Sequence, residues 1–323
     1  MRQFTGSICL FFAFTLAGTG VVSARHLSGK LGIFTITAIS LFFALVFLLP
    51  FCGKTLLASL SRLTWPGRFL LFIQAFFGMF LFRMFLLLGL LHTSAGEAGL
   101  LTGATPAITA ILAALFLKEK INGWKAAGMI CTVAGILLIQ GRMTSNADFS
   151  QAHFFGNLLV LCAACCESSF NILSRSFVKK SDTAEGIGLS PMEQTAAVSA
   201  ATMILCLIPS ALEHPAQRIS ALIPSDWLAL LWYGIFVTVL AFICWYAGIR
   251  RSSAITAAAF SGMMPFTSLF LSVLLLGEQA GLRQWSGGLL VIAGIFLIAS
   301  KQSRDQTDIP IQQVDALIEQ PES

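Results

Sequence analysis

The sequence predicts an all-helical membrane protein with ten transmembrane helices, arranged as two five-helix repeats that cross the membrane in opposite directions. The first observation behind this prediction is composition: the 323 residues are 56% hydrophobic and only 11% charged, whereas soluble domains carry about 25% charged residues. The second is that the apolar residues lie in long runs without strict alternation, which is typical of helices and not of barrel strands. The third is an internal duplication.

The duplication lies between residues 106–139 and 265–298, which align at a constant offset of 159 residues without a gap. Shared Leu and Ile residues are weak evidence for a duplication, because any two apolar runs resemble each other in composition. Prolines, glutamates and glycines that match at one constant offset are stronger evidence. The matched pairs include Pro106 with Pro265, Glu119 with Glu278, Gly128 with Gly287 and Gly135 with Gly294. The chain therefore contains two related halves.

Ten apolar stretches have lengths near the ~20 residues that a helix needs to cross ~30 Å of hydrocarbon. The predicted spans are residues 4–24, 31–51, 69–91, 95–117, 121–140, 154–178, 192–211, 227–249, 254–276 and 284–300. The first repeat is expected to cover residues 4–141 and the second residues 154–300. Residues 301–323 are polar and acidic, which indicates a solvated tail.

The first stretch also has features of a secretory signal peptide. Arg2 precedes a short apolar run, and small residues follow it at 22–24. However, residues 6–25 can be aligned with residues 156–175 at the start of the second half. Cleavage would leave nine spans and an unmatched half, so we expect the first stretch to remain as a helix.

The distribution of Lys and Arg predicts the orientation. With a cytoplasmic N-terminus, the inside segments hold 14 of the 20 basic residues and the outside segments hold five, while Arg83 lies within a span. This bias follows the positive-inside rule and predicts that both termini are cytoplasmic. Five helices per half is an odd number, so the second half must be inverted, which places a substrate site near the midplane.

Three motifs carry a resemblance to a known family. A proline lies early in the fourth and ninth spans, a glutamate ends both spans ("LFLKEK" and "LLLGEQ"), and the fifth and tenth spans are rich in glycine. Over residues 4–300 the chain resembles the EamA-type branch of the drug/metabolite transporter superfamily. The resemblance implies two inverted five-helix EamA-type repeats and a bacterial inner-membrane secondary transporter of small metabolites, often amino acids, commonly exported. Arg83 departs from the family pattern.

These scaffold motifs have structural and functional interpretations. Pro106 and Pro265 each remove an amide donor within a span, so each is either a packing kink or a hinge or cavity wall in alternating access. Glu119 and Glu278 end their helices, where a carboxylate favours the positive N-terminus of the helix that follows. The glycines of the fifth and tenth spans, seven residues apart, predict small faces for bundle packing or for a homodimer.

Charges inside the spans are the strongest candidates for a binding site. Arg83 lies in the third span and Glu167 near the middle of the sixth, with Asn171 and Ser174 on the same face as Glu167. A charge at the centre of a membrane helix costs about 2.5–3.5 kcal/mol, so such charges usually mark a pathway. We expect Arg83 to attract a carboxylate and Glu167 an amino group or a proton. The alternative is a buried ion pair that only fixes helix packing.

Weaker candidates lie on the eighth span and at the turn between the third and fourth spans. Trp245 and Tyr246 would form an aromatic wall of the substrate site, or they would anchor the helix at the membrane interface. His92 and Glu97 bracket the turn, where they would form an outer gate or simply face water.

The chain carries no motif of a nucleotide, metal or catalytic site. A Walker loop, a dinucleotide fingerprint, HExxH and GxSxG are all missing from the sequence, and the cysteines lack His or carboxylate residues at metal-ligand spacing. We therefore expect no enzyme, no metal and no cofactor. The expected partners are the lipid bilayer and a small-molecule substrate, with protons as a candidate coupling ion and no nucleic acid.

Together these features predict a secondary transporter that exports small metabolites, foremost amino acids or related compounds, by alternating access around a midplane cavity. The alternative is a broad efflux carrier for drugs or amphipathic cations, in which the 28 Phe residues would form a permissive wall and Glu167 would hold the cation or a proton. Arg83 in the cavity argues against this alternative.

Overall fold

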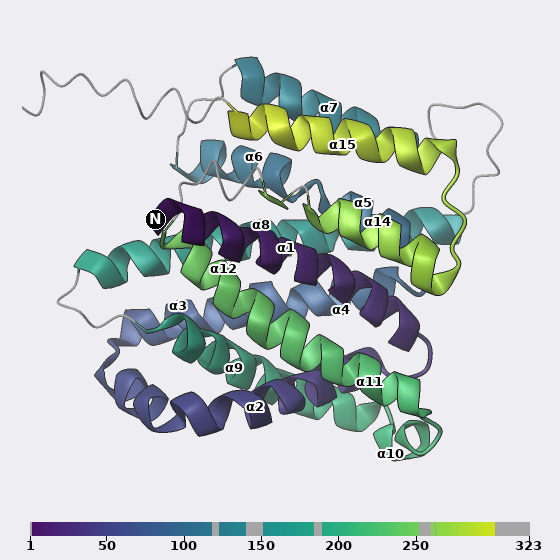
Figure 1. Ribbon diagram of the computed structural model, residues 1–323. Helices are drawn as coiled ribbons and strands as arrows, with labels where there is room; N and C mark the ends of the chain where they lie inside the picture. The colour runs from purple at the N-terminus through teal and green to yellow at the C-terminus, as the bar shows by residue number, and fades with distance from the viewer. Residues whose placement is uncertain are drawn as a thin grey trace, which may run out of the picture.

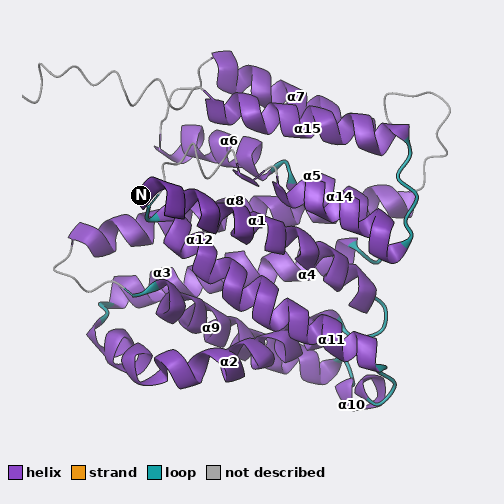
Figure 2. Cartoon of the chain, viewed as in Figure 1, coloured by secondary structure: helices purple, strands orange, loops and turns teal. Residues whose placement is uncertain are grey.

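The computed structural model describes residues 2–117, 123–139, 151–183, 189–251, 260–261 and 263–300. Within these ranges every regular element is a helix and no β-strand is present (Figure 2). This confirms the all-helical prediction. Glu119 and the beginning of the ninth predicted span lie outside the described residues.

Six helical segments are long and apolar enough to cross a membrane. They belong to α1 (Arg2–Leu27), α2 (Ile33–Arg62), the continuous α3–η1–α4 (Trp65–Ala75, Phe76–Leu81, Phe82–Gly89), α8 (Gln151–Thr183), α9 (Pro191–Leu212) and the continuous α11–η2–α12 (Pro224–Trp232, Tyr233–Leu240, Ala241–Ile249). The other predicted spans coincide with shorter helices, α5 (Ala95–Thr102) with α6 (Thr105–Leu117), α7 (Gly123–Ile139), α14 (Met263–Leu276) and α15 (Leu282–Ser300). A short α10 (Pro215–Ile219) follows α9. The number of ten spans stays a prediction.

Two helix boundaries differ clearly from the prediction. Helix α2 continues to Arg62, although its apolar run ends at Phe51, and α8 extends to Thr183 instead of Val178. Hydropathy finds where the chain leaves hydrocarbon, but a helix can continue into water because its backbone hydrogen bonds are internal. The fourth predicted span is not continuous either, because α5 and α6 are separated by a turn at Gly103 and Ala104.

Corresponding helices of the two halves pack against each other and form the two edges of the molecule. Helices α7 and α15 pair along one edge, and α2 and α9 pair along the opposite edge (Figure 1). Helices α1 and α8 lie between these pairs, where α1 contacts α12 and α14 and α8 contacts α4 and α6. The middle of the bundle is therefore lined by elements of both halves.

The glycine faces of α7 and α15 are used within one chain. A Cβ atom on Gly135 would lie 2.6 Å from the carbonyl oxygen of Gly287, and one on Gly294 would lie 2.6 Å from that of Gly128. Glycine is thus required for the close approach of the two helices. Of the two interpretations of these faces, the structure favours bundle packing, and the glycines no longer argue for a homodimer.

A π-helical segment interrupts the long helix of each half at the corresponding position. Shifting Phe76–Leu81 of η1 by the repeat offset gives residues 235–240, which fall inside Tyr233–Leu240 of η2. Neither segment was expected from the sequence. Because π turns are rare and often occur at functional sites, their shared position directs attention to the space between them.

Candidate functional site

A cavity lies in the middle of the bundle, between α1, α8, α14 and the two helices that contain the π segments. It leaves about 100 Å³ for the centres of water-sized molecules, and its wall is mainly apolar. The polar or charged side chains in the wall are Arg83, Glu167, Asn171, Tyr233 and Trp245, and its other aromatic side chains are Phe14, Phe82, Phe170 and Phe242. Elements from both halves of the chain therefore share one chamber.

The structure brings four of the five predicted substrate-contact residues to this cavity. Arg83, Glu167, Asn171 and Trp245 line it, whereas Tyr246 does not. The Tyr246 ring is fully buried behind the wall, with its centroid 6.3 Å from the ring of Phe170. Tyr246 therefore supports the aromatic wall from behind and is not part of the cavity surface.

Helix α1 contributes the small residues of the wall. Ala13, Ala17 and Gly20 line the cavity beside Phe14 and Val21. Gly20 is required there, since a Cβ atom on it would lie 2.6 Å from a methyl carbon of Val237 in η2. Helix α1 thus forms one side of the cavity.

Arg83 is the second residue of α4 and is almost completely buried, with 3% of its surface exposed. Its Nη1 atom donates to Oγ of Ser40 on α2 at 2.9 Å, and its Nη2 atom donates to Oγ1 of Thr238 in η2. The guanidinium carbon lies 4.3 Å from the centre of the Tyr233 ring, which is a cation–π geometry. The arginine, which comes two residues after η1, thus faces an acceptor that lies in η2.

Glu167 is bonded to the break in the fourth predicted helix. Oγ1 of Thr105, the first residue of α6, lies 3.0 Å from Oε2 of Glu167 and 2.8 Å from the carbonyl oxygen of Thr102. A hydroxyl has one proton, so it can donate fully to only one of the two. If Thr105 donates to Thr102, the contact with Glu167 requires a proton on the carboxyl group, and if Glu167 is ionised, the Thr105 proton turns toward it.

The two predicted hinge prolines occupy similar places near the starts of α6 and α14. Pro106 is the second residue of α6 and Pro265 the third residue of α14. Neither is among the lining residues, but Met264, next to Pro265, is. Because Pro106 lies in the first turn of α6, its missing amide costs no helical hydrogen bond there. The break at Gly103 and Ala104 precedes this proline.

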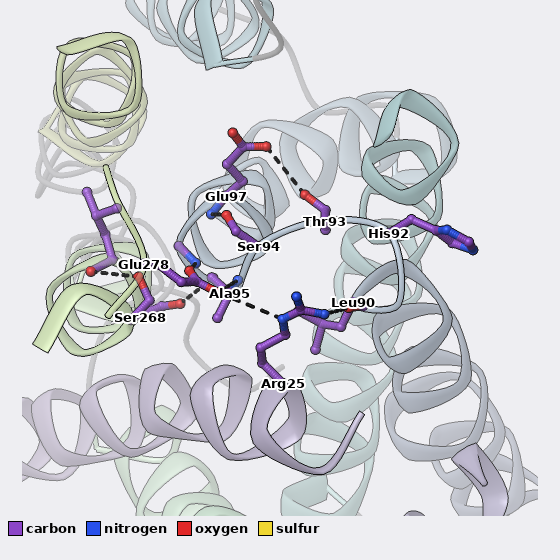
Figure 3. A network of polar contacts seen from close by, with 12 residues as sticks. Arg25, Leu90, His92, Thr93, Ser94, Ala95, Glu97, Ser268 and Glu278 are labelled. Carbon is purple, nitrogen blue, oxygen red and sulfur yellow. Dashed lines mark hydrogen bonds and ion pairs between the residues drawn. The ribbon is translucent and has the colours of Figure 1, made fainter. Parts of the chain in front are cut away.

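Glu278 makes an unexpected contact at one end of the bundle, which we call the Glu278 end. Its two carboxylate oxygens accept hydrogen bonds from the backbone amides of Ala95 and Gly96, at 2.9 and 3.0 Å (Figure 3). Arg25 of α1 lies 3.8 Å from the same carboxylate. We expected Glu278 to interact with the N-terminus of the helix that follows it. Its carboxylate instead caps the N-terminus of α5, in the other half of the chain.

Glu97 and His92 belong to the same end, and Glu97 does not face water. Glu97 is 6% exposed, lies 2.6 Å from Nε2 of His153 and accepts a hydrogen bond from Nε2 of Gln284 at 2.9 Å. Thr93 also contacts it (Figure 3). His92 contributes its backbone oxygen, 3.1 Å from Nδ1 of His153. The end is thus closed by polar contacts among α5, α8 and α15.

Sequence reasoning missed several members of both clusters. Ser40, Thr105 and Thr238 are hydroxyl residues in apolar helices, where such residues commonly bond to their own backbone and give no distinct signal. His153 and Gln284 lie at predicted span ends, where polar residues are ordinary. The π segments were also not evident, because no composition rule separates them from α-helix.

Comparisons with known proteins agree with this architecture. Residues 4–141 and residues 154–300 each match the model of the EamA-like transporter family. The uncharacterized transporter YetK of Bacillus subtilis (strain 168) is 29% identical over 310 residues, which cover 94% of this chain and 89% of YetK. The aromatic amino acid exporter YddG of Ancylobacter novellus is 24% identical over 239 residues, covering 74% and 76% of the two chains.

A solved crystal structure has the same fold. It superposes with a TM-score of 0.67 at 20% identity and covers 95% of this chain and 99% of its own. The helical spans, the family match in both halves and the transporters among the relatives identify a multi-pass membrane transporter and not an enzyme. The chain belongs to the EamA-like transporter family.

Proposed function

We propose that this transporter is a secondary carrier that exports amino acids with large apolar or aromatic side chains, or closely related compounds. One observation carries the proposal: a guanidinium, a carboxyl group and an aromatic wall surround a single cavity. A zwitterionic amino acid matches this set, because its carboxylate pairs with Arg83 and its amino group with Glu167. Its side chain would pack against the rings of Phe14, Phe170 and Phe242. The relative named as an aromatic amino acid exporter supports the same class.

The proposed orientation places both termini in the cytoplasm, as the Lys and Arg distribution predicts. The Glu278 end then faces the outside, and the ten predicted spans form two inverted repeats around the cavity. In this orientation Glu97, with His153 and the backbone of His92, forms the outer gate of an alternating-access cycle. Pro106 and Pro265, near the starts of α6 and α14, act as the hinges of this cycle.

Protons are the proposed coupling ion, and Glu167 is their site. Its carboxyl group contacts a hydroxyl that has an alternative acceptor 2.8 Å away, so the cluster has a complete hydrogen-bond arrangement in either protonation state. A proton on Glu167 would also remove the charge that holds the substrate amino group. Binding of substrate and binding of the proton would therefore compete, as an antiporter requires.

Thermal unfolding of the purified carrier tests the substrate class. L-phenylalanine should stabilise the wild type, and a ligand at one hundred times its Kd adds about 2.7 kcal/mol. Two matched analogues separate the contacts: 3-phenylpropionate lacks the amino group and phenethylamine lacks the carboxylate. Arg83→Gln should lose the response to L-phenylalanine and 3-phenylpropionate. Counterflow of labelled L-phenylalanine in proteoliposomes then tests transport, and no response to any carboxylate would refute the proposal.

The cation efflux carrier is the second candidate, because Glu167 and the aromatic rings would also suit an amphipathic cation. It predicts the opposite pattern: phenethylamine and cationic dyes would stabilise the protein, Glu167→Gln would abolish the effect, and Arg83→Gln would preserve it. The buried guanidinium in the same cavity wall favours the amino acid.

A further inference from the structure

The two hydroxyl groups that hold Arg83 can act only as acceptors toward it. Oγ of Ser40 donates its proton to the carbonyl oxygen of Thr37 at 2.9 Å, and Oγ1 of Thr238 donates to that of Tyr233 at 2.8 Å. Because a hydroxyl has one proton and two lone pairs, both groups face the guanidinium with lone pairs. They orient the arginine without adding negative charge.

The π segment η2 provides one of these acceptors through its backbone. The Thr238 hydroxyl reaches the carbonyl five residues earlier, which is the hydrogen-bond spacing of a π-helix. The direction of its lone pairs is therefore determined by η2 itself. The acceptor geometry around Arg83 belongs to the scaffold and needs no ligand to form.

The charge of Arg83 has no carboxylate partner in the part of the chain that the structure describes. No Asp or Glu oxygen of these residues lies within 4 Å of its guanidinium nitrogens, as the ion pairs involve other groups. Glu167, the other charged residue of the wall, is bonded to Thr105. The Tyr233 ring attracts the cation but cannot neutralise it. A full positive charge thus lies in a mainly apolar wall.

We propose that Arg83 binds a small inorganic monoanion, such as chloride, and that the substrate carboxylate must displace this anion. Two of the five N–H donors of the guanidinium bond to Ser40 and Thr238, which leaves donors for an anion. Charge-assisted bonds of this kind are strong, and the low polarity of the wall strengthens them. Arg83 lines the cavity, so an anion there can reach its guanidinium. The competition rests on the proposed function, whereas the anion site does not.

Thermal unfolding of the full-length carrier in chloride, with methanesulfonate keeping the ionic strength constant, tests the site. The midpoint should rise with chloride concentration in the wild type, in Arg83→Lys and in the control Arg251→Gln, whose arginine is exposed in the turn that follows α12. It should not rise in Arg83→Gln. An equal rise in wild type and Arg83→Gln would overturn the proposal, and so would no rise in the wild type.

Two further measurements keep the outcome clear if Arg83→Gln does not fold. A wild-type crystal soaked in bromide should show an anomalous peak in contact with the Arg83 guanidinium, and no peak there would overturn the site. The Kd of L-phenylalanine should double when chloride equals its own Kd. If L-phenylalanine binds but chloride does not weaken its binding, the anion proposal is refuted and the proposed substrate is not. Chloride stabilisation and a bromide peak, without binding of any amino acid, would leave the site standing and refute the proposed substrate.

Discussion

At the scale of single residues, Thr105 links the charge of Glu167 to the broken helix. Thr105→Val keeps the shape of the side chain but removes the hydroxyl, so the half-buried carboxyl group of Glu167 loses its hydrogen bond. An unsatisfied buried polar group costs about 1–3 kcal/mol, and we expect Thr105→Val to lower stability by that amount. Thr105→Ser should behave like the wild type.

Unfolding of both variants, with and without L-phenylalanine, measures this effect. If Thr105 only packs, the valine variant will be as stable as the wild type and will bind normally. A loss that serine also shows would point to the lost methyl group and not to the hydroxyl.

The two charged residues of the cavity could be predicted from sequence, but their surroundings could not. An Arg or Glu within an apolar span is conspicuous because of its cost in hydrocarbon. Ser40, Thr105 and Thr238 are not conspicuous, since a helix accommodates such hydroxyls by bonding them to its own carbonyls. Their roles depend on which helices meet, and that information is absent from local sequence.

At the scale of elements, Glu278 shows that a sequence motif can be recognised although the helix that it contacts cannot be predicted. The glutamate was expected to act on the next helix in sequence, but it caps α5. Loss of a cap costs about 0.5–2 kcal/mol, so Glu278→Ala should destabilise the protein by that much, whereas Ala substitution of its exposed neighbour Gln279 should not. Chemical or thermal unfolding compares the two, and equal stabilities would show that the cap contributes nothing.

The packing of α7 on α15 makes a second prediction at this scale. Gly135→Ala would place a methyl group 2.6 Å from the Gly287 carbonyl oxygen, and overpacking of this kind typically costs about 1–3 kcal/mol. Gly123→Ala is the matched control, because a Cβ atom there meets nothing within 4 Å. We expect only the first change to lower the unfolding midpoint, and tolerance of Gly135→Ala would contradict the close approach of the helices.

Helix ends and π segments were the least predictable elements. The extension of α2 to Arg62 continues a good helical sequence into polar surroundings, and hydropathy reports only the polarity. The π segments cannot be detected from composition either, because η1 consists of ordinary apolar residues such as Phe76 and Leu81. What reveals η1 is its match with η2 across the repeat, which becomes visible only when both backbones are known.

At the scale of the whole molecule, the repeat predicted which helices correspond but not which of them touch. The register related α7 to α15 and α2 to α9, and each of these pairs proves to be in direct contact. A two-fold relation between halves makes such contacts natural at the axis, yet many arrangements share one register. The choice among them depends on shape, such as the glycine faces of α7 and α15.

The direction in which the bundle crosses the membrane can be tested by labelling. Thr64, between α2 and α3, and Gln217, in α10, are both exposed. With cytoplasmic termini, Thr64 faces the inside and Gln217 the outside. In a variant whose eight cysteines are replaced, we expect a membrane-impermeant maleimide to label Gln217→Cys in intact cells, and Thr64→Cys only after the cells are opened.

The opposite labelling pattern would invert the molecule and place the Glu278 end in the cytoplasm. The contact between Glu97 and His153 would then close the cytoplasmic side of the cavity. An exported substrate would leave through the opposite end of the bundle, which faces the cytoplasm in the proposed orientation. Labelling of both positions in intact cells would instead contradict the predicted number of spans between them. The positive-inside bias of 14 basic residues to five favours the first result.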